Sequence, residues 1–348
     1  MNIYQVVPDP YHLPNPYVRT LIDSLKKQFD DVHISYGLDL FWTNDIFKQH
    51  IVHFHWHDLL GKEKIDIIEP RLHDIKAKGI KIVATCHNFI PHYTKDPQRI
   101  ESYQLIYRNA DLIIHLGDYS KNMMVDLYPQ AIHTIIPHHV YDGYYPKFVS
   151  RDEGLKRLHL NKNKTYILCL GQFRDEEERQ LIYSVSKQFH NQDIVILAPS
   201  LFVFSKNAST QLKARQWIYK KKFEFKHPGI KVDACYVSDE MIPYYYAVST
   251  LSFIHRLKIL NSGNVPLGLY MGKVIVGPNM GNVGCLLKDT GNVTFEVNDM
   301  KSVFDAIEKG IQLSRKGLGE KNHLYAINKM GTDYIAKKMY ISYCRLFM

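Results

Sequence analysis

The chain has 348 residues, 45% of them hydrophobic and 23% charged, which suits a protein of two globular domains. The sequence contains no apolar run of 18 residues that could cross a bilayer. The N-terminal segment lacks a basic stretch followed by an apolar one, so we expect no secretory signal and a cytoplasmic protein. The formal charge of +9 is uneven, because residues 151–348 carry 29 Lys+Arg against 18 Asp+Glu, a field that would attract a phosphorylated small molecule, nucleic acid or an anionic membrane surface.

Short apolar runs rich in Val and Ile alternate with helix-period segments along the chain, a pattern typical of parallel sheets covered by helices. In the first half we expect strands at 2–8, 49–57, 81–88, 111–117 and 133–139, with helices near 15–29, 64–78, 99–109 and 118–127. A charged, strand-poor stretch at 145–163 predicts the linker. In the second half we expect strands at 165–171, 193–199, 231–237, 249–256, 273–278 and 292–297.

These elements predict an α/β protein with two doubly wound, Rossmann-like domains that face each other across a cleft. We expect an N-terminal domain at 1–150, a C-terminal domain at 151–330 and a C-terminal helix at 331–348 that packs back across the domains. Ligands in such folds bind outside the carboxyl ends of the strands, so residues that end strands are the first candidates for chemistry.

Histidines mark the strand ends of the first half. In KIVATCHNFIPHY, residues 81–93, His87 and Asn88 fall where the strand runs out, and His92 follows in the loop. In HFHWH, residues 53–57, three histidines share one strand face, which raises the alternative of a metal site. Since no carboxylate or cysteine accompanies them, we expect packing histidines and no metal, with His57 and Asp58 at the rim of the cleft as candidate proton acceptors.

Two segments of the second half suit an anionic ligand. Asn261, Ser262, Gly263 and Asn264 form a polar turn before a short helix, where backbone N–H groups can bind phosphate oxygens; an ordinary capped helix is the alternative. In LGQFRDEEERQ, residues 170–180, a guanidinium could grip a diphosphate, or be a solvated surface cation. The candidates in that segment are Gly171, Gln172 and Arg174.

Two segments combine cations with apolar residues. The C-terminal stretch, residues 328–348, could lie on an anionic membrane surface, and WIYKKKFEFKH, residues 217–227, could contact an acceptor or a lipid. The alternatives are an internally packed helix for the first and a solvated basic helix end for the second. Nucleic-acid motifs, a G-x-G-x-x-G after the first strand and a G-x-x-x-x-G-K-[ST] loop are all missing from the sequence.

In their order, these segments resemble the GT-B glycosyltransferases of group 1, the family-4-like kind, and in particular the branch that builds bacterial surface polysaccharides. The resemblance covers nearly the whole chain. The matching segments are 51–58, 81–92, 110–120 and 135–146 in the first half and 166–174, 237–263 and 272–284 in the second.

The resemblance implies transfer of a hexose from a UDP- or GDP-sugar to a saccharide acceptor, which could be lipid-linked, with retention and without a metal or other cofactor. His87 would contact the donor sugar near the reacting carbon, and Asn88 and His92 would shape the acceptor side. The diphosphate would lie against residues 261–264, assisted by Arg174 as the catalytic cation and Arg256 as a further cation. Tyr236 and Val237 would seat the nucleotide base through backbone atoms.

The chain departs from the family pattern in three places, and one is the first loop, PDPYHLPNPYV at 8–18, which lacks the glycine pair that often lets an acceptor approach. A pair of glutamates seven residues apart, which many relatives use to contact ribose and sugar, is absent from residues 260–272, and four acids follow Arg174 where a lysine is expected. A sugar- or nucleotide-binding protein without turnover is therefore the alternative function. An epimerase or phosphorylase of the same fold is a further alternative.

Overall fold

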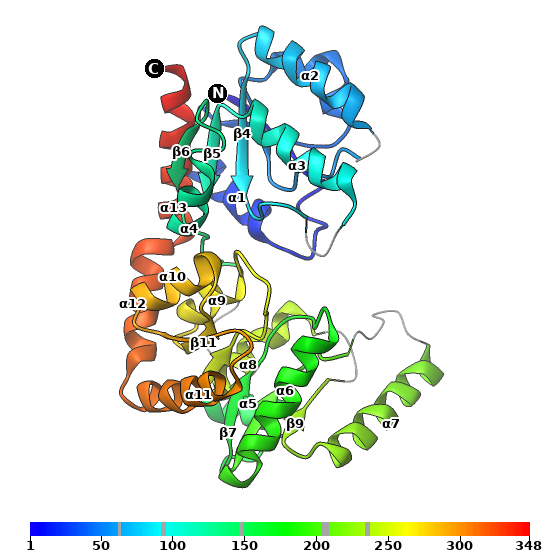
Figure 1. Cartoon of the computed structure of the whole chain (residues 1–348), viewed down its shortest axis with the longest axis vertical. Helices are drawn as coiled ribbons and strands as arrows, with labels where there is room; N and C mark the ends of the chain where they lie inside the picture. Colours follow the sequence, from blue (N-terminus) through cyan, green and yellow to red (C-terminus); the bar gives the residue numbers. More distant parts are fainter. Residues whose placement is uncertain (62–63, 92–94, 146–148, 203–208, 234–236) are drawn as a thin grey trace. The chain divides into compact units, whose positions relative to one another are not determined.

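A computed structural model describes residues 1–61, 64–91, 95–145, 149–202, 209–233 and 237–348. The chain divides into two compact units: the first is Met1–Tyr141 with Met330–Met348, and the second is Asp142–Lys329 (Figure 1). Each unit holds one six-stranded sheet in which all strand pairs are parallel. The predicted fold class, two doubly wound α/β sheets, is confirmed.

The sheet of the first unit has the order β2-β1-β3-β4-β5-β6. Its strands are β1 (Asn2–Val6), β2 (His33–Gly37), β3 (Ile51–Phe54), β4 (Lys81–Cys86), β5 (Leu112–His115) and β6 (Ile132–Ile135). The helices are α1 (Tyr17–Gln28), α2 (Ile65–Ala77), α3 (Pro97–Asn109), α4 (Asp118–Met124) and α13 (Thr332–Cys344), with the 3₁₀ turns η1 (Leu40–Trp42), η2 (Asn44–Lys48) and η6 (Arg345–Phe347).

The C-terminal helix α13 belongs to the first unit. Its Ile335, Ala336, Met339 and Tyr343 are fully buried in a core shared with α1, β1 and β3. Ser24 of α1 donates a hydrogen bond to a carboxylate of α13 at 2.6 Å. The apolar face of this helix is therefore used in packing, the alternative to a membrane role that its sequence left open.

The sheet of the second unit has the order β12-β11-β10-β7-β8-β9. Its strands are β7 (Thr165–Leu168), β8 (Ile194–Leu197), β9 (Ile230–Lys231), β10 (Leu251–Phe253), β11 (Val274–Pro278) and β12 (Val293–Phe295). The helices are α5 (Arg151–Arg157), α6 (Glu176–Phe189), α7 (Thr210–Lys226), α8 (Ile242–Val248), α9 (Asn264–Tyr270), α10 (Gly281–Asp289), α11 (Met300–Arg315) and α12 (Leu318–Met330), with η4 (His190–Gln192) and η5 (Asp239–Met241).

The stretch expected as a linker, 145–163, includes a packed helix. Ser150 caps α5 by accepting a hydrogen bond from the Glu153 N–H, and Gly154 lets α5 approach α8 so closely that a Cβ there would lie 2.7 Å from Val248. The division between the two units lies earlier, between Tyr141 and Asp142.

The strand orders locate one switch point in each sheet, where the direction of winding reverses. It lies between β1 and β3 in the first unit and between β7 and β10 in the second. Loops diverge there on leaving the carboxyl ends, which leaves room for a ligand. No helix in the described parts of the chain combines the length and apolarity needed to cross a membrane.

Candidate functional site

Three loops meet at the carboxyl edge of the second sheet, on both sides of its switch point. The loop after β10 is tied to the loop after β7 by a hydrogen bond from Asn264 Nδ2 to the Leu170 carbonyl, 2.8 Å. It is tied to the start of α10 by Asn282, whose N–H donates to the Leu260 carbonyl at 2.9 Å and whose Nδ2 donates to Asn261 Oδ1 at 2.8 Å. The structure thus brings together the two predicted segments, 170–174 and 261–264.

Gly171 makes this closeness possible. Its φ of +103° is open to glycine, and a Cβ there would lie 3.1 Å from Asn264 Nδ2. Gln172 and Arg174, which follow, are both exposed. The loop therefore carries an exposed guanidinium and an exposed amide, and its Leu170 and Gly171 adjoin the partly exposed turn at 261–264.

Glu178 holds the base of this loop. Its side chain is fully buried, accepts a hydrogen bond from the Arg174 N–H at 2.8 Å, and accepts two from Arg256 Nη1 at 3.0 and 2.7 Å. Arg256 also donates to the Gln172 carbonyl. This guanidinium, expected as a donor-binding cation, is thus engaged in shaping the loop, and Arg174 is the exposed cation next to it.

The acids that follow Arg174 have partners of their own. Asp175 caps α6 by accepting a hydrogen bond from the Glu178 N–H at 3.0 Å. Glu177 lies 3.3 Å from Lys258 and Glu176 lies 3.5 Å from Arg179. Because each carboxylate is capping a helix or paired with a cation, their repulsion toward a phosphate is reduced.

A buried aromatic pair joins the loop after β7 to the loop after β10. His255 stacks on Phe173 with ring centroids 3.9 Å apart, and both rings are buried. Burial lowers the pKa of His255 to about 3, with a further contribution from the adjacent Arg256, so the imidazole is neutral at pH 7.

The predicted turn at residues 261–264 starts α9. Ser262 Oγ accepts a hydrogen bond from the Asn264 N–H at 3.3 Å, and Gly263 stands at the N-cap. Val237, expected near the nucleotide base, is buried, and Tyr236 lies outside the described residues.

A cluster of imidazoles surrounds the Tyr17 ring at the carboxyl edge of the first sheet. Tyr17 begins α1 beside the switch point and is buried. The His139 ring stacks on the Tyr17 ring with centroids 4.8 Å apart, and the other imidazoles around Tyr17 are tilted or edge-on to it. These are His55 at 5.8 Å, His87 at 5.0 Å and His138 at 4.7 Å between ring centroids.

His87 ends a hydrogen-bonded chain. Gln5 Oε1 lies 2.8 Å from His55 Nε2, so that nitrogen carries the proton and His55 Nδ1 is left to accept from His87 Nε2–H, 3.4 Å away. Trp56 stacks on His87 at 5.3 Å. The ring of His87 is thereby held in one orientation while remaining partly exposed.

The imidazoles of this cluster are neutral. Burial holds the pKa of His87 and of His55 well below the ordinary value, and neighbouring imidazoles lower each further. Burial also lowers the pKa of His138 to about 3 and that of His139 to about 4. At neutral pH the edge offers hydrogen-bond donors and acceptors without charge, which suits sugar hydroxyls.

Other predicted residues of the first unit lie differently. His57 falls after the end of β3 and packs against Tyr103 and Tyr107 of α3, with an exposed fraction of 2% and a pKa lowered by burial to about 3. This contradicts its expected place at a rim as a proton acceptor. Asp58 is salt-bridged to Arg99.

The loop after β4 is described only in part. Asn88 accepts a hydrogen bond through its carbonyl from the Tyr107 hydroxyl at 2.6 Å and is partly exposed. His92 lies outside the described residues.

Within 53–57, His53 and His55 are hydrogen-bonded to protein side chains, whereas His57 makes ring contacts with tyrosines. His53 bonds to the Tyr343 hydroxyl at 2.7 Å and to Thr85 Oγ1 at 2.8 Å. Among the described residues no group of three His, Cys, Asp or Glu side chains is arranged to hold a metal ion.

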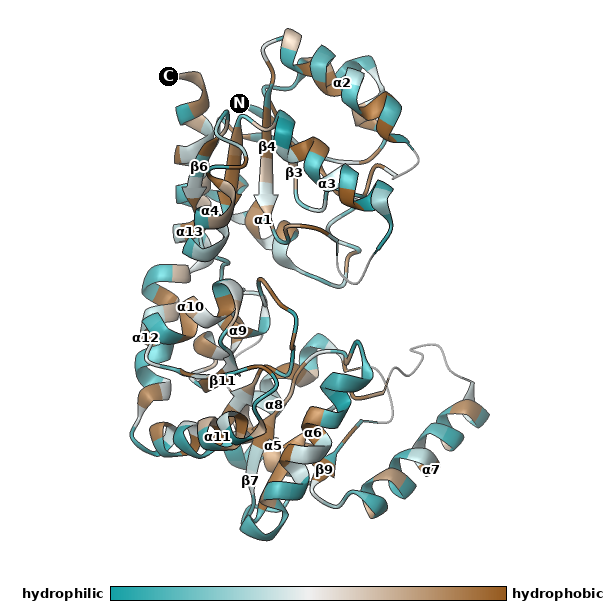
Figure 2. Ribbon diagram, in the orientation of Figure 1, coloured by the Kyte–Doolittle hydropathy of each residue, from teal (hydrophilic) through white to brown (hydrophobic). Residues whose placement is uncertain are grey.

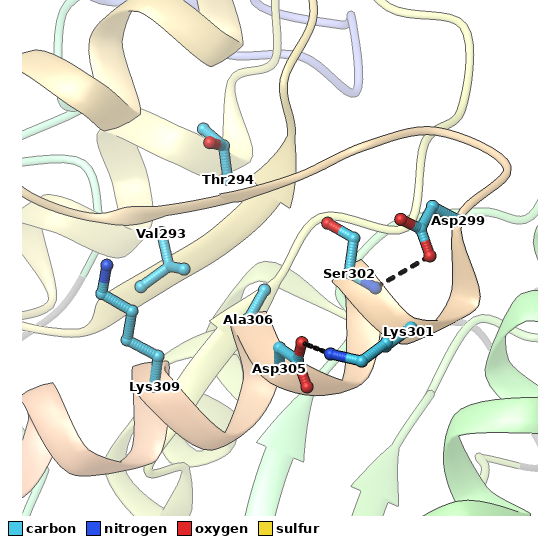
Figure 3. A pocket seen from close by; sticks show the side chains of 8 residues that line it. All are labelled: Val293, Thr294, Asp299, Lys301, Ser302, Asp305, Ala306 and Lys309. Carbon is cyan, nitrogen blue, oxygen red and sulfur yellow. Dashed lines mark hydrogen bonds and ion pairs between the residues drawn. The ribbon is translucent and has the colours of Figure 1, made fainter.

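A surface pocket of about 310 Å³ lies between β12 and α11, away from the three loops (Figure 3). Two of its charged residues pair with each other, since Lys301 is 2.6 Å from Asp305, and a third, Asp299, caps α11 by accepting from the Ser302 N–H. We assign it no ligand, because the switch-point loops do not line it.

The residues that hold these loops in place were not predicted from the sequence. Asp175-x-x-Glu178 has the spacing of a capping box, which could have drawn attention to Glu178. Nothing local marks Tyr17 or Asn282, since their roles depend on packing between segments far apart in the chain.

We compared the chain with known protein families, curated sequences and solved structures. No protein-family profile and no curated protein sequence matches the chain. Among solved structures, sucrose-phosphate synthase from Thermosynechococcus elongatus is similar over 100% of this chain and 99% of its own, with a TM-score of 0.74 and 13% identity. The Anabaena protein HepE, in complex with UDP-glucose, is similar over 98% and 99%, with a TM-score of 0.72 and 12% identity. A glycosyltransferase from Rickettsia africae covers 99% and 98%, with a TM-score of 0.65 and 15% identity. The fold is of the GT-B class.

Proposed function

We propose that the protein is a glycosyltransferase that moves a hexose from a UDP- or GDP-sugar to a free or lipid-linked saccharide acceptor in polysaccharide synthesis. The observation that carries the proposal is the joining of segments 170–174 and 261–264 at the switch point of the second sheet. Similarity over the whole chain to a structure that binds UDP-glucose supports it.

The chemistry places its main demand on the leaving group. As the bond from the anomeric carbon to the donor phosphate breaks, negative charge grows on the departing diphosphate while the sugar becomes oxocarbenium-like. Arg174 would pair with that charge, and Ser262 with the backbone N–H groups of the turn would hold phosphate oxygens. These groups stabilise the diphosphate without a metal, and retention of the anomeric configuration is the expected outcome.

The first unit would supply neutral contacts. His87 keeps an uncharged ring in a fixed orientation, so it can hydrogen-bond a sugar hydroxyl without attracting the diphosphate. Asn88 and His92 are proposed to contribute to the acceptor side.

The test is transfer and donor hydrolysis by the full chain with a panel of UDP- and GDP-sugars. Arg174→Ala or Ser262→Ala should lower kcat/KM by about 10² or more with the preferred donor, as expected when a group that stabilises transition-state charge is removed. Arg315→Ala, which removes an exposed guanidinium from α11, is the matched control and should leave the rate unchanged. Equal rates in all variants would contradict the assignment.

A binding protein without turnover is the second candidate. The region of the missing glutamate pair, 260–272, contains no acid, and Arg256 is engaged by Glu178. A nucleotide sugar that binds, and is neither hydrolysed nor transferred with any acceptor of the panel, would favour this candidate.

A further inference from the structure

Helix α7 projects an unusual surface from the edge of the second unit. It lies beside the edge strand β9 (Figure 1), and it is 17 residues long with three buried ones. Those three are Gln216, Phe223 and Glu224. The inward side is fixed: Glu224 accepts the Val232 N–H at 3.1 Å, and Phe223 packs against Phe202 at 5.0 Å.

The opposite side of α7 is apolar along its centre. Ile218 and Phe225 are seven residues apart, so they lie on one face, about 140 to 160° around the axis from Phe223. Phe225 is 91% exposed and Ile218 is 47% exposed. Apolar side chains therefore occur on both sides of α7, as the mixed colours along this helix in Figure 2 illustrate.

Cations flank this apolar strip on both sides. Arg215, Lys222 and Lys226 lie along one flank. On the other flank Lys221 stands over the Trp217 ring at 5.6 Å, and Trp217 is 55% exposed. The helix has six Lys and Arg side chains and one acid, Glu224, which is buried and lies 3.3 Å from Lys231. The exposed face of α7 thus has no negative charge.

We propose that this face, defined by Arg215, Trp217, Ile218, Lys222 and Phe225, docks the protein on an anionic phospholipid surface. Ile218 and Phe225 would enter the boundary between headgroups and acyl chains, the Trp217 ring would lie at headgroup level, and the cations would pair with lipid phosphates. Charge complementarity selects this partner, because an apolar strip bordered by cations on both flanks matches a lipid surface with anionic headgroups and apolar acyl chains beneath them. The inference goes beyond the proposed function and does not depend on it.

The experiment is co-sedimentation of the full chain with vesicles of phosphatidylglycerol and phosphatidylcholine in equal parts, against vesicles of phosphatidylcholine alone. The protein should bind the anionic vesicles, and binding should weaken as salt is raised. Arg215→Gln with Lys222→Gln should lower the partition coefficient by about 10- to 30-fold, since each cation near such a surface contributes roughly a factor of five. Ile218→Gln with Phe225→Gln should lower it to a similar extent.

The control is Arg315→Gln with Lys316→Gln, which removes the same two charges from exposed positions at the end of α11. It should bind like the unchanged protein, and circular dichroism should show all variants folded. Equal binding to neutral vesicles, no vesicle binding, or an equal loss in the control would each overturn the proposal. Binding of a poly(U) oligomer without vesicle binding would also overturn it, in favour of a nucleic-acid contact.

Discussion

Among single residues, Glu178 is the side chain on which the loop at 170–174, proposed to bind the diphosphate, most depends. It is fully buried and joins the Arg174 N–H to the Arg256 guanidinium, whose side chain is only 13% exposed. Removing one partner of a buried pair leaves the other without compensation. Arg174 is thereby kept in place by a residue that would not itself touch the ligand.

Glu178→Gln should lower the free energy of unfolding by about 3 kcal/mol, because Arg256 would lose its charge partner. The adjacent Glu177 provides the control: its pair with Lys258 is 65% exposed on both sides, so Glu177→Gln should change stability by less than about 0.5 kcal/mol. Urea denaturation of both variants measures the difference. Equal stabilities would contradict the role given to Glu178.

The buried histidines predict a loss of stability in acid. Their pKa values in the folded state lie below the unfolded value of about 6.5, so the unfolded chain binds more protons between about pH 6.5 and 4. Each can therefore remove up to about 1.4 kcal/mol of stability per pH unit as the pH falls through that range. In the first unit these are the buried His53, His55, His57, His115 and His139, together with the partly buried His87 and His138.

Urea denaturation at pH 7.5 and 5.5 should show a fall of several kcal/mol, with the first unit unfolding first. His53→Gln, which removes one such proton site, should make the fall smaller by about 1 kcal/mol. A stability independent of pH in this range would show that the imidazoles are already charged or solvated in the folded chain.

At the scale of elements, the turn between β11 and α10 sets the position of the loop after β10. Gly281 has a φ of +57°, and a Cβ there would lie 2.7 Å from the Ile259 carbonyl oxygen and 2.9 Å from Leu260 Cα. Both are backbone atoms, which cannot move aside without shifting residues 259–264. The turn thus connects the helix start to the candidate site.

Gly281→Ala should destabilise the second unit and weaken nucleotide binding together. Gly291→Ala is the control, since Gly291 also has a positive φ, +69°, but no neighbouring atom within 4 Å of its Cβ position. The control should cost about 1 to 2 kcal/mol from backbone strain alone, and Gly281→Ala at least about 1 kcal/mol more. Thermal melts and nucleotide titrations compare them. Equal losses would show that contact with residues 259–260 is unimportant.

The parts of the fold that the sequence predicted are those with a local signal. Central parallel strands are buried on both faces and read as continuous Val- and Ile-rich runs, so β3, β4, β7 and β11 were expected. The strand β2 was missed because HISYG lies at an edge, with every residue at least partly exposed. Because an edge strand pairs with a neighbouring strand on one side only and is partly exposed, its sequence carries a weak apolar pattern.

The candidate site was predictable to the same degree. Arg174 and Ser262 follow strands, and strand ends gather at one edge of a parallel sheet, so their neighbourhood followed from order along the chain. The prediction for His57 was wrong because β3 ends at Phe54, after which the alternation of faces no longer holds. Contacts such as Asn282 to Asn261 join segments through tertiary packing and have no local signature.

At the scale of the whole molecule, the central claim is that the basic second unit anchors a nucleoside diphosphate. The chain as a whole has a formal charge of +9, and the excess of cations lies after residue 150. A general field would attract any anion, whereas an anchored diphosphate requires one particular guanidinium.

Calorimetric titration of the full chain with UDP and with GDP tests this claim most directly. We predict that one of the two nucleotides binds at one site per chain, that Arg174→Ala weakens its affinity by about 10- to 100-fold, as expected for a charge-assisted hydrogen bond, and that Arg315→Ala leaves it unchanged. Failure of both nucleotides to bind, or equal affinity in the Arg174→Ala variant, would contradict it.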